Sequence, residues 1–122
     1  MVKLLLVDDE PSIRVTLTLI FEQNGFQVRV ADTVSSAFRQ ITSQKFDVLV
    51  SDLNISEPRD GFSILKETLR VNPTCVCVIL TGYPDDRSRA ECVKEGADAY
   101  FAKPALIEEL LRSIREKLPQ SE

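Results

Sequence analysis

FDVLVSDLN, residues 46–54, is the stretch that decides the fold of this chain. Val48, Leu49 and Val50 are strand formers that follow one another without alternating polar residues, which is typical of a strand buried on both faces of a parallel sheet. Asp52 stands at the carboxyl end of that strand. Ligands of open α/β sheets bind at this edge, because the loops that leave the strands form a crevice there. We therefore expect Asp52 to belong to a functional site.

Units of one strand and one helix alternate along the rest of the chain. The apolar patterns predict strands at residues 2–7, 26–30, 46–52, 75–80 and 98–101. Helical spacing of apolar residues predicts helices at residues 11–23, 34–41, 61–71, 85–95 and 106–118. Such alternation indicates an α/β fold, a doubly wound parallel sheet with helices on both faces. We expect one domain over residues 1–118, with 119–122 as a tail or the start of a linker.

Composition limits the classes of function. The chain has 122 residues and 43% hydrophobic residues, enough for one continuous core. No run approaches the ~18 apolar residues of a membrane span, and the N-terminus lacks the pattern of a signal peptide. A net charge of -4 provides no basic face for nucleic acid. We expect a soluble, cytoplasmic domain that binds neither membranes nor nucleic acid directly.

Cysteine and histidine usage excludes further kinds of site. Of the three cysteines, Cys75 and Cys77 lie within an apolar run, which favours buried free thiols in a reducing compartment over a metal site. Histidine is absent. The chain therefore contains no histidine phosphodonor, no Ser-His-Asp triad and no imidazole metal ligand.

Polar residues gather where the predicted strands end. Asp8 and Asp9 follow the first strand, Asp52 ends the third, Thr81 follows the fourth and Lys103 follows the fifth. Carboxylates that converge in one crevice repel one another, and Mg²⁺ relieves that repulsion because it prefers oxygen ligands and leaves a position for a phosphoryl oxygen. A carboxylate, a metal, a hydroxyl and an ammonium around one point are the groups that phosphoryl transfer needs.

Each of these features also has a structural explanation. Taken singly, the acidic run before Pro11 is a solvated loop, Thr81-Gly82 a strand exit, Lys103 a surface lysine and Tyr100 a packing residue. The joint placement of five polar positions at strand ends favours the functional interpretation. Two other enzyme or binding classes fit poorly: Asp52-Leu53-Asn54 lacks the Asp-x-Asp of haloacid dehalogenase phosphatases, and no glycine-rich nucleotide turn follows the first strand.

The chain resembles the receiver domain of two-component response regulators. The motifs that carry this resemblance are LLVDDEP at 5–11, DVLVSD at 47–52, ILTGY at 79–83 and GADAYFAKP at 96–104. Together they span essentially the whole chain. The resemblance implies a flavodoxin-like sheet of five parallel strands in the order 2-1-3-4-5, with five helices.

The resemblance also implies roles for the residues at the strand ends. Asp52 would accept a phosphoryl group from a phosphohistidine or from acetyl phosphate. Mg²⁺ would be bound directly by Asp9 and Asp52, through water by Asp8, and by the backbone carbonyl of Asn54. Such a domain is no enzyme in the ordinary sense, because it catalyses only its own phosphorylation and dephosphorylation.

The remaining implied roles concern the response to phosphorylation. Thr81 would hydrogen-bond the phosphoryl group and Lys103 would pair with it, helped by a cis Lys103–Pro104 bond that aims the lysine inward. Tyr100 would then turn into the space that Thr81 vacates, changing the face formed by residues 85–118. The expected partners are a sensor histidine kinase or histidine phosphotransfer protein, a second copy on phosphorylation, and an output domain beyond Glu122. The alternative is a receiver-like interaction module that works without phosphorylation.

One loop departs from the family pattern. After Asp52 the family has a proline four residues on and then Asp-Gly, whereas here proline is displaced to Pro58 and one extra residue precedes Asp60-Gly61. The sequence leaves the shape of this loop open. Bulky Tyr83, two residues beyond Thr81, flanks the expected path of the hydrolytic water and predicts slow self-dephosphorylation.

Overall fold

Five parallel strands form one sheet in the order β2-β1-β3-β4-β5. The computed structural model describes residues 1–119. The strands are β1 (Val2–Val7), β2 (Phe26–Ala31), β3 (Val48–Asp52), β4 (Val76–Thr81) and β5 (Ala99–Ala102). The helices are α1 (Pro11–Gln23), α2 (Val34–Ser43), α3 (Gly61–Val71), α4 (Asp86–Lys94) and α5 (Ile107–Lys117). The predicted fold and strand order are confirmed, and element bounds differ from the predicted ones by a few residues at most.

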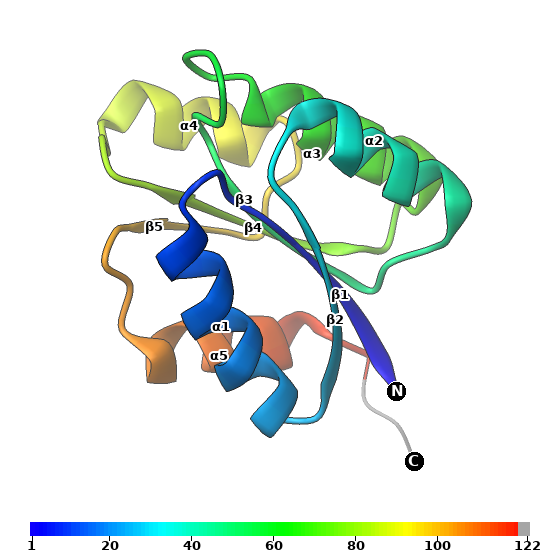
Figure 1. Ribbon diagram of the computed structural model, residues 1–122. Helices are drawn as coiled ribbons and strands as arrows, with labels where there is room; N and C mark the ends of the chain where they lie inside the picture. The colour runs from blue at the N-terminus through cyan, green and yellow to red at the C-terminus, as the bar shows by residue number, and fades with distance from the viewer. Residues whose placement is uncertain (120–122) are drawn as a thin grey trace.

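Helices cover both faces of the sheet. Helices α1 and α5 lie on one face, and α2, α3 and α4 lie on the other (Figure 1). All five residues of β3 are buried. Each face of the sheet has its own hydrophobic core. The core on the side of α1 and α5 contains Phe21 and Leu110, and the core on the other side contains Ile41 of α2 and Leu65 of α3. The uninterrupted apolar run of β3 is therefore explained by packing on both sides.

Local signals set the helix starts. Pro11 begins α1, where its missing N–H costs nothing. Thr33 caps α2 through a reciprocal pair of hydrogen bonds with Ser36. The carboxylate of Asp85 accepts the Ser88 N–H at 2.6 Å, so the predicted first residue of α4 is its cap.

The strand register brings the functional positions to one edge. Val7 lies opposite Ser51 and Asp52 lies opposite Leu80, so β1, β3 and β4 end at nearly the same level. Thr81 in turn lies opposite Ala102. The residues that follow these strands therefore emerge around a single crevice.

The start of α3 presses against the end of β3. The Gly61 N–H donates to the Leu53 carbonyl at 2.8 Å. A side chain at Gly61 would overlap the backbone of Asp52 and Leu53, so only glycine fits at this close approach. This contact closes the loop between β3 and α3 into a ring.

Further predictions concern the cysteines, membrane-spanning helices and the C-terminal tail. All three cysteines are buried and free, and burial raises the pKa of the Cys92 thiol to about 11. Among residues 1–119, no helix is both long enough and apolar enough to cross a bilayer. Residues 120–122 of the predicted tail lie outside the described part, and the domain boundary at 118 stays a prediction.

Candidate functional site

Lys103 joins two buried carboxylates at the carboxyl edge of the sheet. Its ammonium donates to Asp8 Oδ2 and to Asp52 Oδ2, each at 2.8 Å. The Asp8 and Asp52 residues are 1% and 6% exposed, and the Lys103 side chain is 12% exposed. The Lys103–Pro104 peptide bond is cis. Lys103, which follows β5, thus links the residue after β1 to the last residue of β3.

Backbone amides occupy the other oxygen of each carboxylate. Asp8 Oδ1 accepts the Glu10 N–H at 2.9 Å, and Asp52 Oδ1 accepts the Asn54 N–H at 3.1 Å. The guanidinium of Arg14 donates to the Asp8 carbonyl at 2.8 Å, which ties α1 to the same loop. Both carboxylates are therefore held in fixed orientations.

Burial and charge shift the pKa values in this cluster. Burial raises the pKa of the Asp52 carboxyl, although hydrogen bonds from Lys103 and Asn54 act in the opposite direction. Burial also acts to lower the pKa of the Lys103 ammonium, but its hydrogen bonds to Asp52 and Asp8 outweigh this and raise it. One ammonium shared by two carboxylates leaves net negative charge in the crevice, which attracts a cation.

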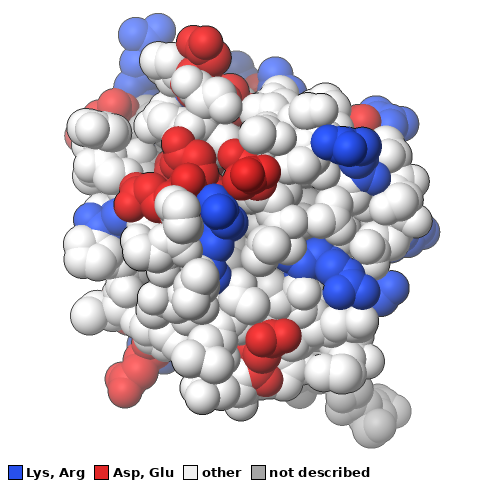
Figure 2. Space-filling model, viewed as in Figure 1, with Lys and Arg blue, Asp and Glu red and all other residues white. Residues whose placement is uncertain are grey.

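Asp9 and Glu10 add two further carboxylates beside Asp8. Carboxylate oxygens of Asp8, Asp9 and Glu10 lie within 4.8 Å of one another. Figure 2 shows acidic side chains gathered beside a basic one, left of centre on the face that it displays. Clustered carboxylate oxygens with one partly exposed side suit a hard divalent cation such as Mg²⁺ or Ca²⁺. The residues present fit the metal that the sequence predicts.

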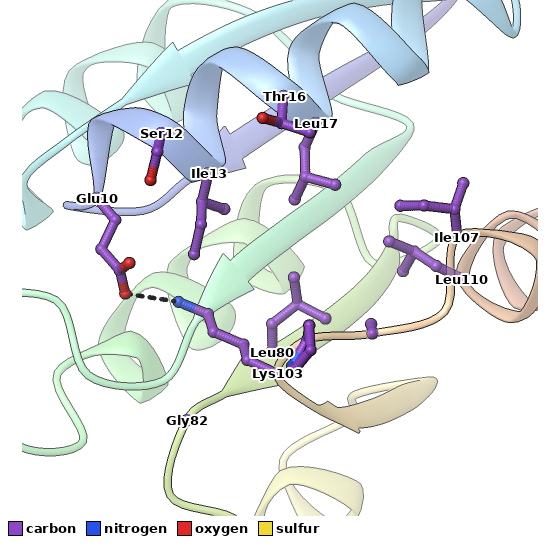
Figure 3. A pocket seen from close by; sticks show the side chains of 12 residues that line it. Glu10, Ser12, Ile13, Thr16, Leu17, Leu80, Gly82, Lys103, Ile107 and Leu110 are labelled. Carbon is purple, nitrogen blue, oxygen red and sulfur yellow. Dashed lines mark ion pairs between the residues drawn. The ribbon is translucent and has the colours of Figure 1, made fainter.

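The sequence analysis did not single out Glu10 as part of this site. Its Oε1 lies 3.7 Å from the Lys103 ammonium, and Figure 3 shows the two side chains pointing toward each other. The signal that could have found it is its position as the third consecutive acid after β1. Its half-exposed carboxylate adds negative charge at the mouth of the crevice.

Thr81 and Tyr100 lie beside the crevice and have other partners. Thr81 is completely buried, and its hydroxyl accepts the Tyr83 N–H at 3.1 Å. The Tyr100 hydroxyl of β5 lies 2.5 Å from the hydroxyl of Ser88, which is a buried residue of α4. The Arg89 guanidinium lies 4.7 Å from the centre of the Tyr100 ring. Among the hydrogen bonds of residues 1–119, none joins Thr81 or Tyr100 to Asp52.

The family of this chain follows from its similarity to known proteins. A family model described as the response regulator receiver domain matches residues 4–115. The chain belongs to this family. It is therefore a receiver domain of two-component response regulators, a signalling domain, as the resemblance implied.

Relatives and solved structures agree with this assignment. Sporulation initiation phosphotransferase F of Bacillus subtilis is 31% identical over 96% of this receiver and 94% of the relative. Transcriptional regulatory protein ZraR of Escherichia coli is 30% identical over 96% of this chain, which spans only 26% of that regulator. A Burkholderia pseudomallei response regulator with a phosphorylated aspartic acid and a calcium ion superposes with a TM-score of 0.87, at 30% identity, over 93% of this chain and 66% of the other.

A cavity that the sequence did not predict adjoins the crevice. It lies between α1 and the start of α5, and Glu10 and Lys103 stand at one end of it (Figure 3). Its walls are mostly apolar, with Ile13 and Leu17 from α1 and Leu110 from α5. The receiver thus has a largely apolar hollow next to its acidic crevice.

The unusual loop after Asp52 is compact. The Asp60 carboxylate accepts the N–H groups of Ile55, Ser56 and Glu57 at 2.7, 2.9 and 2.9 Å. Arg59 adopts a positive φ of 65°, a conformation that residues other than glycine rarely take. The extra residue is therefore accommodated inside a ring of hydrogen bonds, and the metal role of the Asn54 carbonyl stays a prediction.

Proposed function

We propose that this receiver accepts a phosphoryl group on Asp52 from the phosphohistidine of a sensor histidine kinase or histidine phosphotransfer protein. The observation that carries the proposal is the buried Asp52 carboxylate, held between the Lys103 ammonium and the Asn54 N–H at the edge of the sheet. A carboxylate fixed in this way is a positioned nucleophile. The acidic residues around it supply the place for a divalent cation.

The chemistry follows from the groups at the crevice. A carboxylate oxygen of Asp52 forms the new bond to phosphorus while the bond from phosphorus to the donor's ring nitrogen, or to the acetyl oxygen of acetyl phosphate, breaks. The Lys103 ammonium neutralises charge on the transferred group. Asp8, Asp9, Asp52 and the Asn54 carbonyl would hold Mg²⁺, which supplies charge neutralisation of the phosphoryl oxygens when bound. By the same groups the domain would catalyse its own dephosphorylation.

The proposed signal is a change in the face made by α4, β5 and α5. Phosphorylation adds about -1.5 to -2 charge units, which would draw the Thr81 hydroxyl and the Lys103 ammonium toward the phosphoryl group. Thr81 would leave the Tyr83 amide, and Tyr100 would follow into the vacated space. That face would bind a second copy or another partner in the cytoplasm, and an output domain beyond Glu122 would read the change.

The first test is intact-mass spectrometry after incubation with acetyl phosphate, with and without Mg²⁺. We expect one Mg²⁺-dependent phosphoryl adduct on the wild type and none on Asp52→Asn. Asp86→Asn, which changes an exposed carboxylate at the start of α4, serves as the matched control and should retain the adduct. No adduct under conditions where Mg²⁺ binding is confirmed, with a histidine phosphodonor also failing, would favour the phosphorylation-independent module.

The second test addresses the output face. Fluoroberyllate with Mg²⁺ imitates a phosphoryl group on a carboxylate, so it should shift amide resonances of α4, β5 and α5 as well as those near Asp52. Shifts restricted to the crevice would contradict the proposed switch while leaving phosphorylation itself intact.

A further inference from the structure

The loop between β3 and α3 connects the phosphoacceptor to α4 as well as carrying the predicted metal ligand. Asn54 is the first link, because its N–H donates to Asp52 Oδ1 at 3.1 Å. The side-chain oxygen of the same residue accepts the Arg59 N–H at 2.6 Å. One residue therefore bridges the Asp52 carboxylate and the end of the loop that leads into α3.

Arg59 is the second link. Its guanidinium forms an ion pair with Glu91 of α4, a residue 32 positions later in the chain. It also lies 5.0 Å from the centre of the Phe62 ring, a cation–π contact that restricts where the side chain can go. The backbone of Arg59 is held at positive φ, which is unfavourable for arginine and persists only where the surroundings impose it. The arginine is thus fixed at its backbone and along its side chain.

We propose that Asn54, Arg59 and Glu91 form a second connection between the phosphorylation site and α4, separate from the one through Thr81 and Tyr100. This inference rests on the proposed function of Asp52. When Asp52 becomes an acyl phosphate, its carboxylate charge passes to the phosphoryl group and the remaining ester and carbonyl oxygens are weaker acceptors. The Asn54 N–H loses a charge-assisted bond, and the loop that it shares with Arg59 changes position against Glu91.

The geometry favours coupling over an incidental surface contact. An exposed ion pair alone contributes little, because two mobile side chains must be ordered to form it. Here the loop is already ordered by the three amides that Asp60 binds and by the contact between Gly61 and Leu53. The loop therefore has no flexible segment that could take up a displacement of Asn54. Because coupling between sites is reciprocal, a partner that displaces Glu91 will also change the affinity of the site for its ligands.

Amide chemical shifts of the full chain test the connection, with Mg²⁺ and fluoroberyllate as the probe. We expect Arg59→Gly and Glu91→Gln each to reduce the shift changes of residues 86–94 by about half, while those at Asn54 and Thr81 remain. Arg59→Gly also removes the unfavourable φ, so unfolding is not expected to interfere. Combining Arg59→Gly with Thr81→Ala should abolish the response of α4.

Arg87→Ala is the matched control. Arg87 also approaches Glu91, at 3.6 Å, but both residues lie on α4, so this pair does not reach the loop. We expect its response to equal that of the wild type. The inference is overturned if Arg59→Gly and Glu91→Gln respond like the wild type, or if Arg87→Ala loses as much as they do. If the probe shifts no resonance near Asp52 in the wild type, the proposed function fails first and the inference fails with it.

Discussion

Aspartates lie at both edges of the sheet, and the two edges use them differently. At the amino edge, Asp47 precedes β3 and accepts the Lys3 N–H at 2.9 Å, and Asp98 precedes β5 and accepts the Cys77 N–H at 2.9 Å. Each exposed carboxylate thus fixes its strand against a neighbour. At the carboxyl edge, Asp8 and Asp52 are buried and share one ammonium. The first edge gains stability from its carboxylates, whereas the second holds negative charge in excess.

The largest expected effect comes from removing the shared ammonium. Lys103→Met leaves two buried carboxylates without their counter-charge, which should lower the free energy of unfolding by about 3 kcal/mol at neutral pH. Mg²⁺ should restore part of the loss, because a cation replaces the missing charge. Urea denaturation with and without Mg²⁺ measures both effects. Lys45→Met, at an exposed position, is the control, and equal losses in the two variants would contradict the prediction.

Disrupting the amino edge should cost less and should not respond to metal. Asp98→Ala removes the acceptor of the Cys77 N–H, so we expect a loss of about 1–2 kcal/mol in the free energy of unfolding. Asp86→Ala, an exposed substitution on α4, controls for the loss of a surface charge. If Mg²⁺ raises the free energy of unfolding of Asp98→Ala more than that of the wild type, the distinction between the two edges is contradicted.

Neutralising Asp52 should stabilise the metal-free protein. Because burial raises the pKa of Asp52 above its ordinary value of 3.8, stability falls as the pH rises from 3.8 towards the folded-state pKa, and the loss is complete above that pKa. Asp52→Asn should therefore gain about 1 kcal/mol at neutral pH, and the gain should decline below the folded-state pKa and vanish below 3.8, where the carboxyl is protonated in both states. Thermal unfolding of both proteins across this pH range measures the difference. A loss of stability at neutral pH would show that the pair with Lys103 outweighs burial.

The smallest expected effect concerns the lifetime of the phosphoryl group. Tyr83 is 81% exposed and lines a shallow pocket with Asn54, Ile55 and Pro58 beside the crevice. Its ring would hinder an approaching water, so Tyr83→Ala should lose the phosphoryl group about threefold faster, a change of under about 1 kcal/mol in the barrier. Decay of the adduct followed by mass spectrometry tests this, with Tyr83→Phe expected to match the wild type. Equal decay in all three proteins would count against the shielding role.

The fold and the position of the site could be predicted because both follow from short-range patterns. The apolar run before Asp52 defines a central strand, and parallel strands bring their carboxyl ends to one edge. The contact of Lys103 with Asp8 and Asp52 is consistent with that argument. The same reasoning could not show that Thr81 bonds to the Tyr83 amide, because the rotation of a hydroxyl depends on the acceptor and donor nearest to it.

The contacts of exposed side chains were beyond prediction for a different reason. Nothing in the spacing of Arg59 and Glu91 indicates that they meet, since one lies in a loop with an extra residue and the other on a helix. Glu10 likewise has a flexible side chain, and its approach to Lys103 depends on the packing of α1 against the loop after β5. Such contacts require the tertiary arrangement before they can be recognised.

The contact between Gly61 and Leu53 also bears on how this receiver can be altered. The 2.8 Å hydrogen bond fixes the two ends of the loop side by side, whatever lies between them. The cost of lengthening a closed loop grows only slowly with its length. The segment around Ser56 to Pro58 is exposed, so a peptide tag inserted there would disrupt the amide bonds to Asp60 but leave the contact between Gly61 and Leu53 in place. The strand that ends on Asp52 would therefore keep its place while this segment is varied, at the cost of the order that links the loop to α4.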